Sequence, residues 1–222
     1  MAIIKKDILS SFTGKLGNLA IRNINGKTIA AARPSHYNKS NSDKAVSQRN
    51  KFSIVNGFAK NIYLFEELVK IWNQYSYQKS TAYNSIMSNN LKSTTNEGLT
   101  LSNIIVPPSD YNLINDISII DNYANVTIEL PQNYLSQVIE SKISIFLVFA
   151  GFNENGELIF GIADGSFIAE QDAGISVIKV FPNVEQIAII KNIENAKVFG
   201  TAVWYLRNNF DLCWSSTFGK KL

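Results

Sequence analysis

The sequence predicts an α+β protein, in which an N-terminal β-hairpin, a long helix and a short helix precede an antiparallel β-sandwich or small barrel. Asn25-Gly26 separates two apolar stretches, as in a two-residue hairpin turn. Apolar residues then recur at helical spacing, and after residue 98 short apolar segments alternate with turn residues. We therefore expect a basic hairpin-arm-helix module over residues 1–98 and an antiparallel β-sandwich domain over residues 99–222.

The hairpin is expected to join residues 16–23 to residues 27–33, because Asn-Gly favours positive φ at both central positions of the turn. Residues 33–41 contain Pro34 and many polar side chains without periodicity. Proline biases the residue before it toward extended conformations, so this stretch predicts an extended arm.

Ser42 is suited to cap a helix that begins near Asp43, whose carboxylate favours a helix N-terminus. Apolar side chains spaced by three or four residues predict one long helix to about Tyr77. They are Ile54, Phe58, Ile62, Phe65, Val69 and Trp72. Gly57 interrupts this stripe and indicates a bend or a close contact. A second, shorter helix is expected after its cap at Ser80.

The second half is expected to consist of short strands. They are residues 99–106, 124–130, 143–152, 157–162, 174–181, 187–190, 197–206 and 212–218. Residues 131–138 predict a short helical connection. The longest apolar stretch, residues 143–152, has about half the roughly 20 residues that a membrane-spanning helix needs, so we expect a buried strand and no membrane partner.

Basic residues are concentrated near the N-terminus. Residues 1–60 hold 11 Lys and Arg against two acidic residues (+9), whereas the remainder holds 10 against 16 (−6). Such a separation predicts that the basic part binds an acidic partner, either nucleic acid or the acidic part of a neighbouring copy. A merely solvated basic surface is the alternative. The candidate partner-binding residues are Lys15, Arg22, Lys27, Arg33, Lys39, Lys44, Arg49 and Lys51.

Few residues could support nucleophilic or metal chemistry. The single histidine, His36, lies in the polar arm, where nothing provides a rigid setting for a base. The single cysteine, Cys213, lies between Leu212 and Trp214, as expected of a small buried side chain. One cysteine cannot form an internal disulfide, and one histidine with one cysteine is too few for a zinc site of that type.

The sequence also gives little support for nucleotide binding or for catalysis by a pair of carboxylates. Gly26-Lys27-Thr28 resembles the end of a phosphate-binding P-loop, but residue 21 is Ile and both flanks look like strands. Glu66 and Glu67 are adjacent on a helix and so point in different directions. Asp164 and Asp172 flank turn residues, where aspartate is common. We therefore expect no enzymatic activity, no cofactor and no bound metal.

Several segments resemble a family of uncharacterised proteins from Bacteroidetes bacteria and their phages and prophages. They are residues 12–18 (Phe-Thr-Gly-Lys-Leu-Gly-Asn), 25–27, 33–34, 48–52 (Gln-Arg-Asn-Lys-Phe), 81–85 (Thr-Ala-Tyr-Asn-Ser), 90–92 and, more weakly, 215–218. The resemblance covers mainly the first 110 or so residues, and the three alanines at 30–32 depart from it. It implies a two-part molecule encoded in mobile or viral genomes, and it supplies no catalytic residues.

These observations together predict a non-catalytic phage or prophage virion structural protein: a capsid-associated, connector or tail subunit. We expect it in the virion or the host cytoplasm, where it would self-associate or bind other virion proteins. One alternative is a nucleic-acid-binding protein that uses the basic N-terminal half. A second is a surface or carbohydrate-binding sandwich, which would require Trp204, Tyr205 and Trp214 to form an exposed cluster instead of packing in a core.

Overall fold

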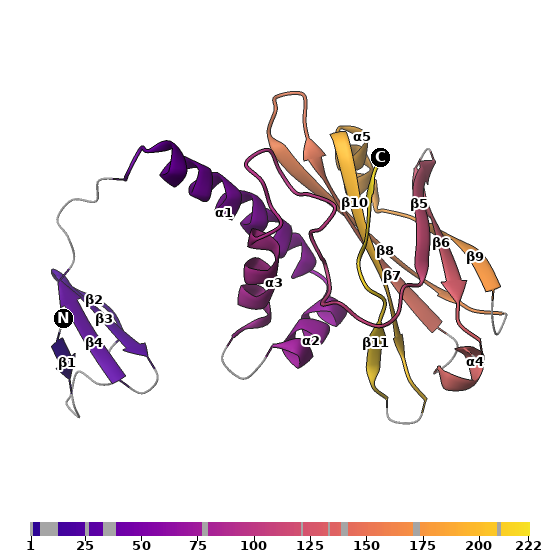
Figure 1. Ribbon diagram of the computed structural model, residues 1–222, viewed down its shortest axis with the longest axis horizontal. Coiled ribbons are helices and arrows are strands. Elements are labelled where there is room, and N and C mark those ends of the chain that lie inside the picture. The colour runs from indigo at the N-terminus through magenta and orange to yellow at the C-terminus, as the bar shows by residue number, and fades with distance from the viewer. Residues whose placement is uncertain are drawn as a thin grey trace. The chain divides into compact units, whose positions relative to one another are not determined.

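Figure 1 shows the computed structural model of the chain. The structure describes residues 2–4, 13–24, 27–32, 39–76, 80–120, 122–132, 134–138, 142–170, 174–207 and 210–222. Residues 2–4, 24, 27, 135 and 184 are described by their backbone alone. The chain divides into two compact units, residues 1–42 and residues 43–222, and each is described below by itself.

The N-terminal unit is an antiparallel sheet with the strand order β1-β4-β3-β2. Its strands are β1 (Ala2–Ile4), β2 (Gly14–Leu16), β3 (Leu19–Ile24) and β4 (Lys27–Ala32). Ile24 pairs with Lys27, so β3 and β4 form the expected hairpin across residues 25–26, which themselves lie outside the described residues. A strand, β4, follows Gly26, whereas a P-loop would need a helix there.

The second unit begins with three helices: α1 (Asp43–Ile62), α2 (Glu66–Tyr75) and α3 (Ala82–Leu91). The prediction of one long helix to about residue 77 was wrong, because the helix ends at Ile62 and restarts at Glu66. Phe65 N–H donates to the Ile62 carbonyl in a tight turn at 3.2 Å, and the Phe65 ring packs 5.0 Å from that of Phe146. The break thus allows Phe65 to pack on the sheet, a contact that helical periodicity cannot reveal.

Gly57 in α1 makes the close contact that the sequence suggested. A Cβ atom placed there would lie 2.6 Å from Phe160 Cε2. Because glycine has no side chain, the helix can lie this close to the sheet. The cap of α3 is Thr81 instead of Ser80, and Thr81 Oγ1 accepts a hydrogen bond from the Asn84 N–H at 3.2 Å.

Residues 99–106 do not form the expected strand. Leu99, Ile105 and Val106 are buried, but the backbone bonds to side chains instead of to a neighbouring strand. Thr217 Oγ1 accepts from the Ile105 N–H at 3.0 Å and from the Val106 N–H at 3.3 Å, and Trp72 Nε1 donates to the Ile105 carbonyl at 2.9 Å. A short apolar segment can therefore be buried without pairing in a sheet.

Two further antiparallel sheets complete this unit. The five-stranded sheet has the order β11-β10-β7-β8, with β12 also pairing β10, and the three-stranded sheet has the order β5-β6-β9. Their strands are β5 (Ile114–Ile120), β6 (Tyr123–Leu130), β7 (Lys142–Phe152), β8 (Leu158–Ile168), β9 (Gly174–Val180), β10 (Glu194–Tyr205), β11 (Leu212–Trp214) and β12 (Phe218–Lys221). Two short helices, α4 (Tyr134–Gln137) and α5 (Val184–Lys191), connect strands.

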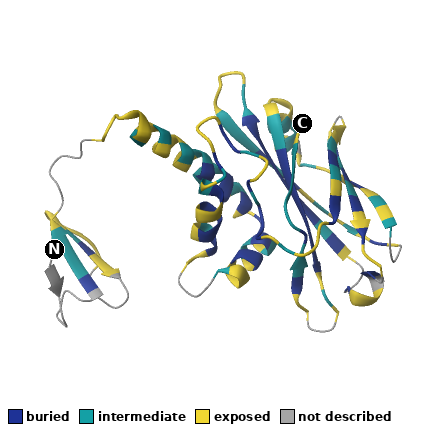
Figure 2. Ribbon diagram, viewed as in Figure 1, coloured by how far each residue is buried: buried dark blue, intermediate teal, exposed yellow. Residues whose placement is uncertain are grey.

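The five-stranded sheet is the middle of three layers (Figures 1 and 2). Alternate residues of β7 point to opposite faces. Phe146, Val148 and Ala150 join the core formed with the helices. Ile143, Ile145, Leu147 and Phe149 join a second core, shared with the three-stranded sheet. The α+β class and the N-terminal hairpin are therefore confirmed, whereas the described strands do not close into a barrel.

Other strand predictions were wrong in detail. Residues 187–190 lie in helix α5, whose cap is Asn183: its Oδ1 accepts from the Gln186 N–H at 2.9 Å. Strand β5 was not expected, β8 extends beyond residue 162, and residues 212–218 contribute to two strands instead of one. In the part of the chain that is described, no helix is long and apolar enough to span a bilayer.

The compact units divide after residue 42, whereas the sequence suggested a boundary after residue 98. The change from helical to strand periodicity does occur near residue 98. However, α1 and α3 pack on the same core as β7 and β10, so residues 43–98 are structurally continuous with the sheets.

Candidate functional site

The predicted basic residues are distributed over both compact units. Lys15 and Arg22 are exposed on strands β2 and β3 of the N-terminal unit, and Lys39 is exposed before α1. The side chain of Lys27 and the whole of Arg33 lie outside the described residues. On α1, Lys44 and Arg49 are exposed and Lys51 is half-buried. Three of the cations therefore lie on one helix, where Lys44 and Lys51, seven residues apart, share a face.

The boundary between the units also separates charge. Residues 1–42 contain seven Lys and Arg against Asp7, a charge of +6, which leaves 14 basic and 17 acidic residues, or −3, for residues 43–222. Neither Lys15 nor Arg22 has an ion-pair partner among the residues that the structure describes. The net positive charge of the chain therefore belongs to residues 1–42.

Few of the described side chains of the N-terminal sheet are buried. Of its described side chains only Ile21 and Thr28 are buried, whereas Leu16 is 56% exposed and Leu19 41% exposed. Domains of roughly 40 residues or fewer usually need disulfides, metals or association with another surface to be stable.

The first half of α1 carries a second exposed feature. A shallow hollow of about 460 Å³ lies along Gln48, Arg49, Phe52, Ser53, Asn56 and Leu91. Phe52 is 56% exposed beside Arg49. A cation next to an exposed aromatic ring is an arrangement that can bind a phosphate and stack on a base.

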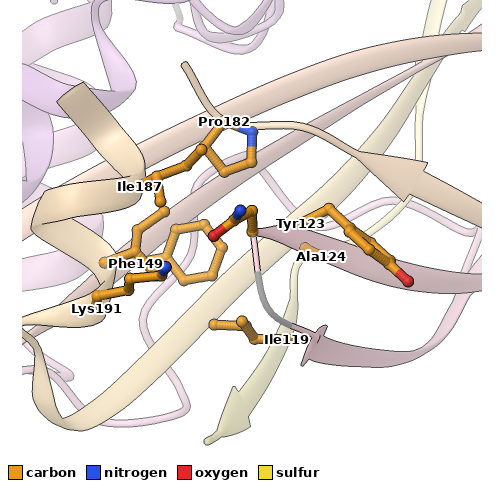
Figure 3. A pocket seen from close by; sticks show the side chains of 9 residues that line it. Ile119, Tyr123, Ala124, Phe149, Pro182, Ile187 and Lys191 are labelled. Atoms are coloured by element: carbon orange, nitrogen blue, oxygen red, sulfur yellow. The ribbon is translucent and has the colours of Figure 1, made fainter. Parts of the chain in front are cut away.

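An apolar hollow lies between α5 and the end of the three-stranded sheet (Figure 3). Its walls include Ile119, Tyr123, Phe149 and Ile187, and Lys191 lies at its rim. Its volume is about 80 Å³. Pockets for small molecules and cofactors are usually roughly 300–1,000 Å³ with a few converging polar groups. This hollow is accordingly a packing defect near the end of the sandwich-like layers and not a cofactor site.

The potential nucleophile Cys213 is half-buried on β11. Burial raises the pKa of its thiol, and the nearby carboxylate of Asp211 raises that pKa further. A thiol is reactive as the thiolate, so this environment suppresses nucleophilicity at neutral pH. His36 lies outside the described residues, and within the described ranges no group of three or more His, Cys, Asp or Glu is placed to hold a metal ion.

The aromatic cluster required for carbohydrate binding is not formed. Trp204 is buried, and Trp214 packs against the helical core while its Nε1 donates to the Pro107 carbonyl at 2.9 Å. Tyr205 is exposed but has neither tryptophan beside it on the surface. The core-packing interpretation therefore holds for both tryptophans.

The sequence did not predict which strands form the edges of the sheets. Strand β8 pairs only with β7 among the described strands, and it is flanked by a groove of about 600 Å³ whose walls include Glu66, Glu67 and Asp164. Neither the helix break before Glu66 nor the full length of β8 was expected, and both are needed to form this groove. In residues 163–167 (Ala-Asp-Gly-Ser-Phe) the polar side chains Asp164 and Ser166 alternate with less polar residues, and this was the available signal.

The chain matches no protein-family model, and no curated protein matches it. The resemblance to the Bacteroidetes and phage family thus stays a prediction from the sequence.

Proposed function

We propose that this chain is a non-catalytic structural protein of a phage or prophage particle, a capsid-associated, connector or tail subunit, that assembles through its basic N-terminal unit. It belongs by this proposal to the resembling family and acts in the virion or the host cytoplasm. The two facing sheets of residues 114–221 serve as a β-sandwich that provides the rigid body.

The N-terminal unit is the observation that carries the proposal. Its sheet buries few of its described side chains and leaves Leu16 and Leu19 exposed, and residues 1–42 together hold a charge of +6. Exposed apolar side chains ringed by charge are typical of surfaces that bind another protein. Lys15 and Arg22 supply the cations for an acidic neighbour, and Lys27, Arg33 and Lys39 belong to the same segment.

The nature of the contact predicts its response to salt. A protein–protein interface that buries apolar side chains loses little affinity when exposed charges are screened. Binding to duplex DNA through Lys and Arg falls steeply as salt rises, because each neutralised phosphate releases counterions. The two functions therefore differ in one measurable property.

The decisive experiment is the molar mass of the full-length protein by light scattering at low and high salt, with and without duplex DNA. We expect an oligomer that persists at high salt and whose mass is unchanged by DNA. A variant with Leu16→Ser and Leu19→Ser should lose this oligomer, whereas the matched exposed-surface variant Leu101→Ser should retain it. A monomer that binds DNA only at low salt would refute the proposal.

Nucleic-acid binding remains the second candidate because Arg49 and Phe52 lie together on the exposed half of α1. If this site binds single-stranded DNA, Phe52→Ala should weaken binding by roughly 1–3 kcal/mol through lost base stacking. The same change should leave the molar mass of the protein unaltered. This pair of readouts separates the candidate from assembly through the N-terminal unit.

A further inference from the structure

The outer edge of β8 is an unpaired strand edge. Its backbone pairs on one side with β7, from Lys142↔Ile168 to Phe152↔Leu158, and with no described strand on the other side. In an antiparallel pair, the N–H and C=O of alternate residues point to the same side. The Ile162 N–H points outward, since it donates to Gln186 Oε1 at 2.7 Å. Asp164, Ser166 and Ile168 therefore present their N–H and C=O groups outward as well.

One face of this edge borders an acidic groove. The groove, of about 600 Å³, lies between β8 and the start of α2. Its walls carry the carboxylates of Glu66, Glu67 and Asp164 against the single cation Lys142, and Leu64 is two-thirds exposed beside them. A strand added along β8 would direct half of its side chains into this acidic groove.

The far end of the same edge carries exposed apolar side chains. Here a hollow of about 380 Å³ separates the end of β8 from β9. Ile168, Ile175 and Val177, which line it, are each more than 60% exposed. Exposed apolar side chains beside an unpaired edge are avoided in stable monomers because they promote pairing with another chain. Ile168 lies on the same face of β8 as Asp164, so an added strand that reaches the end of β8 would also meet this apolar side chain.

The N-terminal unit contains a strand with complementary properties. β2 is one edge of its sheet, and its described side chains are all exposed. Lys15 and Leu16 are adjacent, so they point to opposite faces of the strand. The face of β2 that carries Lys15 thus offers a cation to the acidic groove beside β8, and Leu16 adds an exposed apolar side chain on the opposite face.

We propose that strand β2 of one copy pairs with the outer edge of β8 of a second copy. Addition of a strand to an exposed sheet edge is a common form of recognition, in which backbone hydrogen bonds supply affinity and flanking pockets supply specificity. The contact joins two different surfaces, so it builds a closed ring or an open filament according to the rotation it imposes. This inference rests on the proposed assembly function and names the surface through which it occurs.

A charge exchange in the full-length protein tests the pairing. Lys15→Glu and Asp164→Lys should each weaken self-association by roughly tenfold or more, because each places like charges together at the contact. The double variant should recover most of the wild-type affinity, as measured by sedimentation over a range of concentrations. Lys44→Glu, an equally exposed change on α1, should have no effect. If the double variant is as weak as the single variants, the pairing is wrong.

Two further variants test the strand edge itself. Ser166→Pro removes one outward N–H at an exposed position and should abolish self-association with little effect on folding, since proline is tolerated on a free edge. In a Cys213→Ser background, mixing a Lys15→Cys protein with a Ser166→Cys protein in the presence of oxidised glutathione, which accepts the two electrons, should give a disulfide-linked dimer of the two. If the Ser166→Pro protein still forms oligomers, the proposed pairing is wrong, although the proposed assembly function is not affected. A wild-type protein that stays monomeric at all concentrations would overturn both.

Discussion

The Asn103 side chain donates from Nδ2 to Asn90 Oδ1 at 3.1 Å, in a fully buried pair between α3 and the segment after it. Asn90 Oδ1 also accepts from the Ile104 N–H at 2.7 Å, and Asn90 Nδ2 donates to the Ile86 and Ile104 carbonyls. Thr94 Oγ1 accepts from Asn103 and donates to the Asn90 carbonyl. This network holds residues 99–106 beneath the helices without strand pairing.

Replacement of Asn90 by alanine should therefore be severely destabilising. It leaves the Ile104 N–H and carbonyl unpaired in the core, at a cost of about 1–3 kcal/mol for each buried group. We expect the free energy of unfolding in urea to fall by about 3 kcal/mol or more. Asn89→Ala, which removes a single bond from an exposed neighbour to the Ser85 carbonyl, should cost less than about 1 kcal/mol. Equal losses for the two variants would contradict a structural role for the network.

Gly57→Ala should destabilise the protein even though alanine is the better helix former. Alanine in a helix gains up to about 1 kcal/mol over glycine. However, its Cβ would lie 2.6 Å from Phe160 Cε2, and overpacking costs typically about 1–3 kcal/mol. The melting temperature should therefore fall in Gly57→Ala and recover in part when Phe160→Leu is added. A rise in the melting temperature of the single variant would show that Phe160 moves aside freely.

Thr217→Val tests the hydroxyl that accepts from the N–H groups of Ile105 and Val106. Valine keeps the shape of threonine but cannot accept either bond. We expect a loss of about 1–3 kcal/mol in the free energy of unfolding. The amides of residues 105 and 106 should also exchange their hydrogens faster, a local readout that a general loss of packing would not single out.

Tyr134→Phe is expected to stabilise the protein. The Tyr134 hydroxyl is buried and has no hydrogen-bond partner among the described residues, so removing it should raise the free energy of unfolding by about 1 kcal/mol at neutral pH. Burial, and to a lesser degree nearby Cys213, raises the pKa of Tyr134 far above its ordinary value. The control Tyr205→Phe, at an exposed position, should change stability by less than about 0.5 kcal/mol.

The same raised pKa predicts an effect of alkali. The unfolded chain releases the tyrosine proton at a pKa of about 10, whereas the folded protein retains it, so stability falls as the pH rises above that value. This decline should be shallower in Tyr134→Phe than in the wild type. Parallel pH profiles for the two proteins would show that Tyr134 ionises as easily when folded as when unfolded.

Cys213 should react slowly with thiol reagents, and the midpoint of its rate–pH profile should lie above the ordinary cysteine pKa of about 8.5. Burial is the main cause of the raised pKa, and the carboxylate of Asp211 adds to it. Asp211→Asn should therefore move the rate profile partly toward lower pH. The distant change Asp164→Asn should leave it in place, and an equal shift in both variants would exclude a local effect of Asp211.

Local signals were sufficient for much of the architecture. The Asn25-Gly26 turn predicted the β3–β4 hairpin, and the apolar stripe from Ile54 to Trp72 does lie in or against the helical core. Residues 143–152 were predicted as a buried strand because they are apolar throughout. Their burial on both faces in β7 agrees with that pattern.

The failures arise where long-range contacts decide the structure. Residues 99–106 have the composition of a strand, yet their backbone partners are side chains such as Thr217, more than 100 positions away in the sequence. Residues 187–190 are equally apolar, but the cap at Asn183 makes them a helix. The acidic groove beside β8 depends on the break before Glu66, which is set by the contact between Phe65 and Phe146.

The position of β7 in the middle layer has a consequence for how the molecule unfolds. Its side chains belong alternately to the helical core and to the core between the sheets, so neither core can open without exposing the other. Residues 43–222 should therefore melt in a single cooperative transition, in which the slowest-exchanging amides lie in β7 and β10. No described side chain of the N-terminal sheet belongs to either core, so its amides should exchange more readily, and the proposed pairing with a second copy would slow that exchange.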